Sequence, residues 1–154
     1  MTLELKLVSA AANGDLKLVQ KLTSQGVNIK EDALTMAATQ GHFEVVKCLV
    51  ENGADIHVNR ELPFHCAIVS NNLELVKYIV EQGTDISAFD NYALISAVLR
   101  NKIEIVRYFI EDCNVDIRPL ETYTWKICRE KELAYMAGYL ASKGLNIDIS
   151  KIFN

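Results

Sequence analysis

Apolar residues recur along the chain with a helical spacing, and the whole pattern returns about every 30 residues. The first apolar positions of the five copies are Leu16, Phe43, Leu73, Ile103 and Leu133. Apolar residues follow three and six positions later: Val19, Val46, Val76, Val106 and Met136, then Leu22, Leu49, Ile79, Phe109 and Tyr139. This spacing places the side chains on one face of a helix with about 3.6 residues per turn. The pattern therefore predicts a repeat protein with five copies of one amphipathic helix.

Each of these helices is followed by a residue suited to the left-handed backbone region. Gly26, Gly53 and Gly83 come ten residues after the first apolar position, whereas Asn114 and Gly144 come eleven after it. Glycine adopts this conformation at the lowest cost, and asparagine is next. We therefore expect these residues to end the helices, and the fourth and fifth copies to carry one extra helical residue.

A shorter helix is predicted before each amphipathic helix. Its apolar residues are Leu7, Leu34, Phe64 and Leu94, with Thr124 in the fifth copy, and three positions later Ala10, Ala37, Ala67, Ala97 and Ile127. The small alanines allow neighbouring helices to approach closely. Short turns containing Gly or Asn join most of the helix pairs. The predicted unit is thus helix, tight turn, antiparallel helix and loop, which makes the fold all-α.

The repeats resemble those of the ankyrin-repeat family. Residues 62–67, Leu-Pro-Phe-His-Cys-Ala, match the family motif T-P-L-H-x-A at Pro, His and Ala. Residues 41–55, GHFEVVKCLVENGAD, match its second-helix pattern almost completely. The resemblance extends over residues 3–148 and implies an ankyrin-repeat solenoid forming a single domain, 1–154. The expected repeats are about 1–29, 30–56, 57–86, 87–117 and 118–148, with a tail at 149–154.

The period of about 30 is shorter than the 33 residues of the family. Because the helices are full length, the missing residues fall in the loop between repeats, which is the β-hairpin finger of the family. We therefore expect short loops or trimmed fingers. Shortened repeats of this kind resemble those of large DNA viruses and intracellular bacteria, whose ankyrin proteins commonly act on host proteins.

The fifth repeat differs from the others in its aromatic content. It brings Trp125, Tyr135 and Tyr139, and the tail adds Ile152 and Phe153. Two interpretations are open for this aromatic C-terminal end face. Either the tail folds back and covers it, or it meets another protomer or a partner.

Composition excludes several classes of protein. The 16 basic residues are scattered among 20 acidic ones, which argues against a nucleic-acid partner. No apolar run approaches the ~18 residues of a membrane span, and the N-terminus lacks the basic segment of a secretory signal. The four cysteines are too widely spaced for a zinc site and indicate reduced thiols in an intracellular protein. We expect a cytoplasmic protein, in the host cytosol if it comes from a pathogen.

Residue patterns for catalysis, cofactors or metals are absent from the sequence. His42 and His65 lie in structural positions of the family motifs, and His57 lies in a loop. Cys66 follows His65 directly, and adjacent residues of a helix point about 100° apart, so the two do not form a nucleophile–base pair. The Glu–Lys or Glu–Arg pairs at 44/47, 74/77 and 104/107 are expected on a solvated helix face. The sequence therefore predicts no enzyme.

The resemblance implies a partner protein bound on the concave side, which the loops and the first helices form. The expected contact residues are Thr39, Gln40, Asn59, Arg60, Glu61, Val69, Ser70, Phe89, Asp90, Asn91, Leu99, Arg100, Arg129 and Glu130. Phe89, Val69 and Leu99 are apolar where water is expected, which favours binding anchors. Alternatively, the shortened loops fold down and Phe89 only covers the groove.

Arg60, Arg100 and Arg129 are candidates for a basic streak that attracts an acidic segment. The leading hypothesis is a monomeric interaction module, such as an adaptor or a host-binding protein of a pathogen. The alternative is a structural role through homo-oligomerisation of the aromatic end face. An appended enzymatic domain has no room, because repeats occupy nearly every residue.

Overall fold

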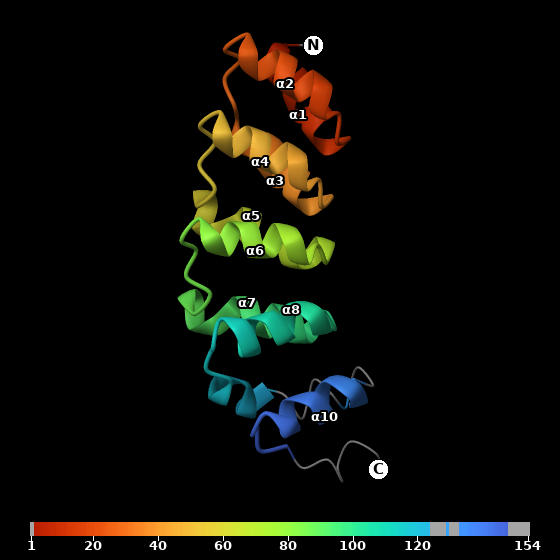
Figure 1. Cartoon of the computed structure of the whole chain (residues 1–154), viewed down its shortest axis with the longest axis vertical. Coiled ribbons are helices and arrows are strands. Elements are labelled where there is room, and N and C mark those ends of the chain that lie inside the picture. Colours follow the sequence, from red (N-terminus) through yellow and green to blue (C-terminus); the bar gives the residue numbers. More distant parts are fainter. Residues whose placement is uncertain (1, 124–128, 130–132, 148–154) are drawn as a thin grey trace. The chain divides into compact units, whose positions relative to one another are not determined.

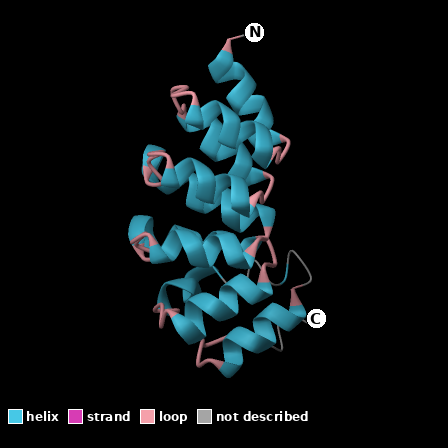
Figure 2. Ribbon diagram, turned by 45° about the horizontal axis from the view of Figure 1, so that its top comes forward, coloured by secondary structure: helices cyan, strands magenta, loops and turns pink. Residues whose placement is uncertain are grey.

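The computed structural model describes residues 2–123, 129 and 133–147 (Figure 1). Across these described residues the regular structure is helical and contains no strand, as Figure 2 shows. The predicted all-α repeat fold is therefore confirmed. Backbone contacts divide the chain into two compact units, residues 1–85 (unit 1) and residues 86–154 (unit 2), which are described separately below.

Unit 1 consists of three antiparallel helix pairs. The first helices of the pairs are α1 (Leu3–Ala12), α3 (Glu31–Thr39) and α5 (Val58–Ser70). The second helices are α2 (Leu16–Ser24), α4 (Phe43–Glu51) and α6 (Leu73–Glu81). Helix α3 contacts α1 on one side and α5 on the other, and α2 contacts α4 (Figure 1). Successive pairs thus stack in the order of the sequence, as in a solenoid.

The core of unit 1 contains the apolar positions that the sequence pattern marks. Val46, Leu49, Val76 and Ile79 are completely buried on the second helices. The alanines of the first helices, such as Ala37, are buried as well, which confirms their role in close helix packing. The first members of the stripe behave differently, because Leu16, Phe43 and Leu73 are only half-buried. The apolar stripe therefore reaches the surface at the start of each second helix.

Short turns join the helices of each pair. Gly14, Gly41 and Asn71 occupy the left-handed region, with φ of +71°, +72° and +60°. Asn72 then caps α6, since its Oδ1 accepts the Leu75 amide hydrogen at 3.0 Å. Its Nδ2 also donates to the Gly41 carbonyl of the preceding pair at 2.8 Å. The turn residues thus cap their own helix and bind the neighbouring repeat.

The loops between repeats contain no hairpin finger in the described residues. Helix α5 begins with three residues in the left-handed region: Asn59 (φ +50°), Arg60 (φ +58°) and Glu61 (φ +61°). The right-handed part of α5 follows them. A single left-handed turn therefore takes the place of the finger, which confirms short loops and adds a conformation that the sequence did not predict.

Unit 2 begins with α7 (Ala88–Leu99), which opens in the same way at Phe89, Asp90 and Asn91. Helix α8 (Ile103–Arg107) continues into a π-helical segment, η1 (Tyr108–Asp112). A π-helix accommodates one more residue than an α-helix of the same length. The extra residue predicted for the fourth repeat is therefore found here, and Asn114 ends the segment at φ +54°.

The fifth repeat corrects the predicted register. After η2 (Arg118–Leu120), the next described helix is α10 (Ala134–Ser142), and Leu133 precedes it as the N-cap residue. Met136, Ala137 and Leu140 are its buried residues. The stripe predicted at Leu133, Met136 and Tyr139 is therefore wrong at Tyr139, which is half-buried. The extra residue lies before this helix and shifts its buried face by one position.

Tyr139 belongs to a polar cluster on the surface of unit 2. Its hydroxyl donates to Glu111 Oε1 at 3.1 Å, and Lys143 Nζ lies 2.8 Å from the same oxygen. Arg107 approaches Glu111 at 4.0 Å, so its nearest acidic partner is this residue rather than the expected Glu104. Hydrogen bonds from Lys143 and then Tyr139 hold the pKa of the Glu111 carboxyl below its usual value. The predicted end-face residues Trp125, Ile152 and Phe153 lie outside the described residues.

Candidate partner-binding surface

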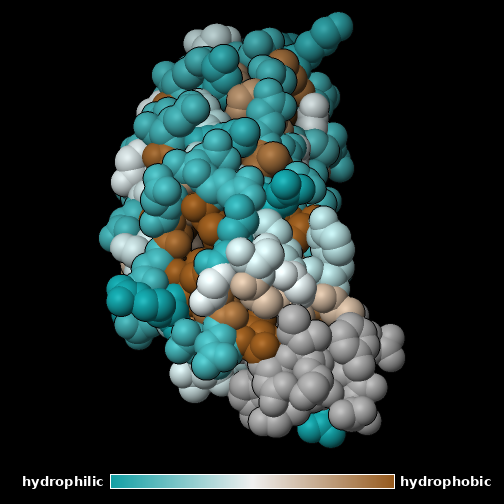
Figure 3. Space-filling view, turned by 60° about the horizontal axis from the view of Figure 1, so that its bottom comes forward, coloured by the Kyte–Doolittle hydropathy of each residue, from teal (hydrophilic) through white to brown (hydrophobic). Residues whose placement is uncertain are grey.

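The first helices of unit 1 carry apolar side chains that are open to solvent. Met36 on α3 is 45% exposed, and Leu62 and Val69 on α5 are 36% and 38% exposed. These three residues define what we call the first-helix face of unit 1. In Figure 3, apolar atoms likewise reach the surface in patches among polar residues. Val69 is therefore exposed, as its predicted role requires.

The expected contact residues of unit 1 fall into two groups. One group lies at the C-terminal ends of the first helices: Thr39 and Gln40 at α3, and Val69 and Ser70 at α5. The other group, Asn59, Arg60 and Glu61, lies in the left-handed turn at the opposite end of α5. The length of the right-handed part of α5, roughly 13 Å at 1.5 Å per residue, separates the two groups.

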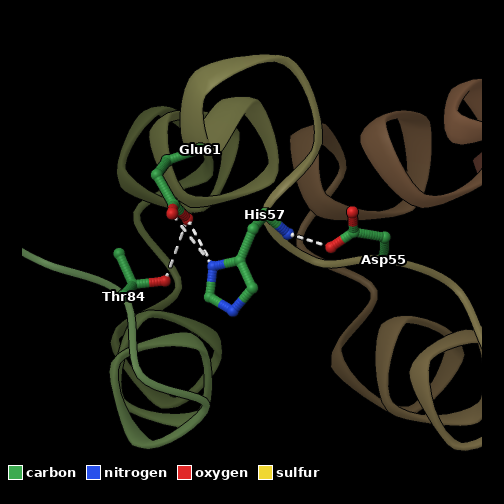
Figure 4. A network of polar contacts seen from close by, with 4 residues as sticks. All are labelled: Asp55, His57, Glu61 and Thr84. Atoms are coloured by element: carbon green, nitrogen blue, oxygen red, sulfur yellow. Dashed lines mark hydrogen bonds and ion pairs between the residues drawn. The ribbon is translucent and has the colours of Figure 1, made fainter.

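Glu61 is held in a polar network at the left-handed turn (Figure 4). Its carboxylate oxygens lie 2.9 and 3.0 Å from His57 Nδ1, and Oε2 accepts a hydrogen bond from the buried Thr84 hydroxyl at 3.0 Å. Asp55 Oδ1 accepts the His57 backbone amide hydrogen at 2.9 Å. Four residues from two successive loops are thus joined. His57, expected only as an exposed loop residue, is a member of this network.

Asn59 is engaged in a similar way. Its Nδ2 donates to Glu31 Oε2 at 2.7 Å and connects the turn to the start of α3. Asn59 and Glu61 therefore hold the loops of unit 1 together. Their place in the expected contact set rests on the shape they give to the loop.

The first helix of unit 2 presents a larger apolar surface. Phe89 is 51% exposed, Tyr92 51% and Leu99 38%. Phe89 lies in the left-handed turn, and Leu99 is the last residue of α7. Tyr92 was not among the expected residues, because its position is acidic in the second repeat and apolar in the third. We call these three residues the α7 patch.

Polar residues accompany the α7 patch. Asp90 and Arg100 are exposed, whereas Asn91 is partly buried and its Oδ1 has no hydrogen-bond partner. Arg129 is exposed as well, and Glu130 lies outside the described residues. The structure thus leaves most of the expected polar residues of unit 2 open to solvent.

The basic streak stays a prediction. Arg60 precedes the right-handed part of α5, whereas Arg100 is the C-cap residue of α7. The two arginines therefore occupy opposite ends of the first helix in their own repeats, instead of equivalent positions.

A family model that describes ankyrin repeats, in three copies, matches residues 7–90, which is more than half of the chain. The chain belongs to the ankyrin-repeat family. Ankyrin repeats are generally protein–protein interaction modules. Comparison with curated proteins returns no match for this sequence.

Within this ankyrin-repeat chain the histidines have structural roles. His42 Nε2 lies 3.1 Å from the Ala12 carbonyl oxygen of the preceding repeat. Burial lowers the pKa of His65, and the Glu61 carboxylate opposes this effect. Among the described residues, no group of three His, Cys, Asp or Glu side chains is arranged to hold a metal ion, and no helix is long and apolar enough to cross a membrane.

Proposed function

We propose that this ankyrin-repeat chain is a non-catalytic protein-interaction module. The observation that carries the proposal is the α7 patch, in which two aromatic residues and a leucine are exposed on one first helix. Large exposed apolar side chains rimmed by polar groups are typical of binding sites, and aromatic residues often dominate their binding energy. The proposal takes residues 1–154 as one ankyrin-repeat domain acting as an adaptor.

The left-handed turn supports an anchor role for Phe89. A non-glycine residue at φ +54° is strained, and such strain persists where the surrounding structure over-determines it. Here the turn directs chain into α7 while about half of the Phe89 side chain stays in solvent. A partner that covers this ring would gain its burial without a change in the loop. The proposed contact set is the expected one, with Tyr92 added.

The partner proposed here is a protein of unknown identity, met in the cytoplasm. The short repeats add the narrower proposal that the chain comes from a virus or an intracellular bacterium and acts on a host protein. This part rests on the resemblance in repeat length alone.

The alternative function is homo-oligomerisation through the end of unit 2. One observation favours it: Tyr135 on α10 is 70% exposed. Tyr139 is a weaker candidate for such an interface, because its hydroxyl already donates to Glu111. A dimer that forms with rising concentration and is lost in Tyr135→Glu would support this alternative.

The test compares the double variant Phe89→Ala/Arg100→Ala with the matched control Tyr135→Ala. Both carry the loss of an exposed aromatic ring, but only the first lies on α7. With a captured partner, the double variant should weaken binding by about tenfold or more, which corresponds to ~1.4 kcal/mol, and should keep its melting temperature. Equal binding by the double variant and the wild-type chain would exclude the α7 patch.

A further inference from the structure

A second surface of unit 1 lies on the side of the second helices. Between α4 and α6 the chain forms an open groove of about 580 Å³, lined by Phe43, Leu73, Glu74, Lys77, Tyr78 and Glu81. We call it the α4–α6 groove. Its volume falls within the usual range of ligand sites, about 300–1,000 Å³. None of its residues belongs to the contact set proposed above.

Aromatic rings form the apolar part of this groove. Phe43 begins α4 and Tyr78 lies on α6, and their ring centroids are 5.6 Å apart with an interplanar angle of 86°. Both side chains are half-buried, so each keeps part of its ring in solvent. Leu73 begins α6 beside them and is half-buried too. This edge-to-face pair gives the groove a rigid apolar floor.

Carboxylates lie at both ends of the groove. Glu74 and Glu81 are seven residues apart on α6, which corresponds to about 10 Å along the helix axis. Burial, and next the Glu51 carboxylate, raise the pKa of Tyr78, so a third acidic group acts on the same rings. Lys77, between the two glutamates, is the basic residue of the lining.

The charge of the surrounding unit has the same sign. Residues 1–85 contain 11 acidic and 7 basic residues, whereas residues 86–154 contain nine of each. Unit 1 therefore carries the whole formal charge of −4. A negatively charged surface attracts cationic segments and repels phosphate groups.

We propose that the α4–α6 groove binds a short basic segment of a partner protein, with two arginines pairing with Glu74 and Glu81 over the rings of Phe43 and Tyr78. An extended chain advances about 3.3 Å per residue, so arginines three positions apart span the 10 Å between the two carboxylates. Arginine suits the groove because its planar guanidinium stacks on aromatic rings and pairs with carboxylates. This surface is separate from the α7 patch, and its test does not depend on the function proposed above.

The probe is a labelled peptide amide, acetyl-Ala-Arg-Ala-Ala-Arg-Ala, titrated with the full chain at low salt and followed by fluorescence anisotropy. Glu74→Gln and Glu81→Gln should each weaken its binding about fivefold, and Phe43→Leu by a similar factor. Lys77→Ala should tighten it, because it removes the opposing charge from the groove. A peptide with glutamates in place of the arginines should not bind.

Glu4→Gln is the matched control for Glu74→Gln. Each glutamate is the second residue of its helix, α1 or α6, so both substitutions remove the same charge from a first helical turn. Glu81 ends α6, where a negative charge opposes the helix dipole, so its loss should leave the melting temperature unchanged or higher. Weaker binding by Glu81→Gln would then not come from unfolding.

Three results would overturn the proposal. The first is absence of arginine-peptide binding at millimolar concentration. The second is an equal loss of binding in Glu4→Gln, which would indicate unspecific attraction to the charged unit. The third is a concentration-dependent dimer in light scattering that disappears in Glu81→Gln, which would assign the groove to a second copy of the chain.

Discussion

The turn between α1 and α2 offers a sensitive test of how neighbouring repeats are joined. Gly14 has φ +71°, and a Cβ atom built on it would lie 2.8 Å from Cε1 and Nδ1 of His42. The same ring places its Nε2 3.1 Å from the Ala12 carbonyl oxygen. Gly26, after α2, has nearly the same φ, +72°, but nothing within 4 Å of its Cβ position. Substitution by alanine therefore separates backbone strain from the contact with His42.

The expected magnitudes follow from these two environments. Gly26→Ala should lower the free energy of unfolding by about 1 kcal/mol, the cost of a Cβ in the left-handed region. Gly14→Ala carries the same strain, and it also displaces the His42 ring. Loss of the ring's hydrogen bond costs about 1 kcal/mol, and the displaced packing adds a similar amount. We therefore expect about 2–3 kcal/mol for Gly14→Ala.

Urea unfolding followed by circular dichroism, on the single variants and on Gly14→Ala/His42→Ala, completes a double-mutant cycle. Without the ring, Gly14→Ala should cost only about 1 kcal/mol, as Gly26→Ala does. The coupling energy should then be about 1–2 kcal/mol. Equal costs of Gly14→Ala with and without His42 would refute the idea that this ring limits the turn, and so would equal costs at Gly14 and Gly26.

Two further predictions concern other contacts between repeats. Asn72→Ala removes both the cap of the third backbone amide of α6 and the hydrogen bond to the Gly41 carbonyl, so urea unfolding should show a loss of about 2 kcal/mol. Burial and then the hydrogen bond to Glu111 raise the pKa of Tyr139 from 10.0 to about 12. The protonated phenol is therefore favoured by the fold, and its contribution to stability is complete below pH 10 and is lost as the pH rises towards 12. Tyr139→Phe should flatten the unfolding midpoint over this range, whereas Tyr135→Phe, at a 70% exposed position, should not.

The helices and their ends were predictable because their signals are local. The stripe through Val46 and Leu49 needs only a period of 3.6 residues, and both side chains are buried. Gly53 and Asn114 were predicted to end helices because few residues adopt the left-handed region, and both have positive φ. The same reasoning failed at Tyr139, since the number of residues between two repeats does not reveal where an extra residue is placed.

The left-handed turns could not be derived from local signals. Arg60, Glu61 and Phe89 have no preference for positive φ, and no glycine marks either loop. Asn59, Asp90 and Asn91 do tolerate this region, but a lone Asn or Asp occurs in many other turns. The polar network at Glu61 depends on Thr84, which is 23 residues away in the sequence. Only the packed loops bring these groups together.

The binding surfaces were predictable in part. Val69, Phe89 and Leu99 are exposed, as expected for apolar residues at these positions. The α4–α6 groove was missed because Phe43 begins the apolar stripe and was counted with the core. A stripe defines the side of a helix that faces inward, but it does not show how far along the helix neighbouring repeats cover it.

The left-handed residue at the end of each second helix has a consequence for how such a chain changes length. In the fourth repeat the extra residue is absorbed as a π-helical turn before Asn114, and in the fifth it precedes α10, which still ends at Gly144. The stop residue acts as a full stop that restores the reading phase after each copy. A residue gained or lost in one repeat is therefore corrected before the next begins, and insertions can accumulate singly without disrupting the remaining stack.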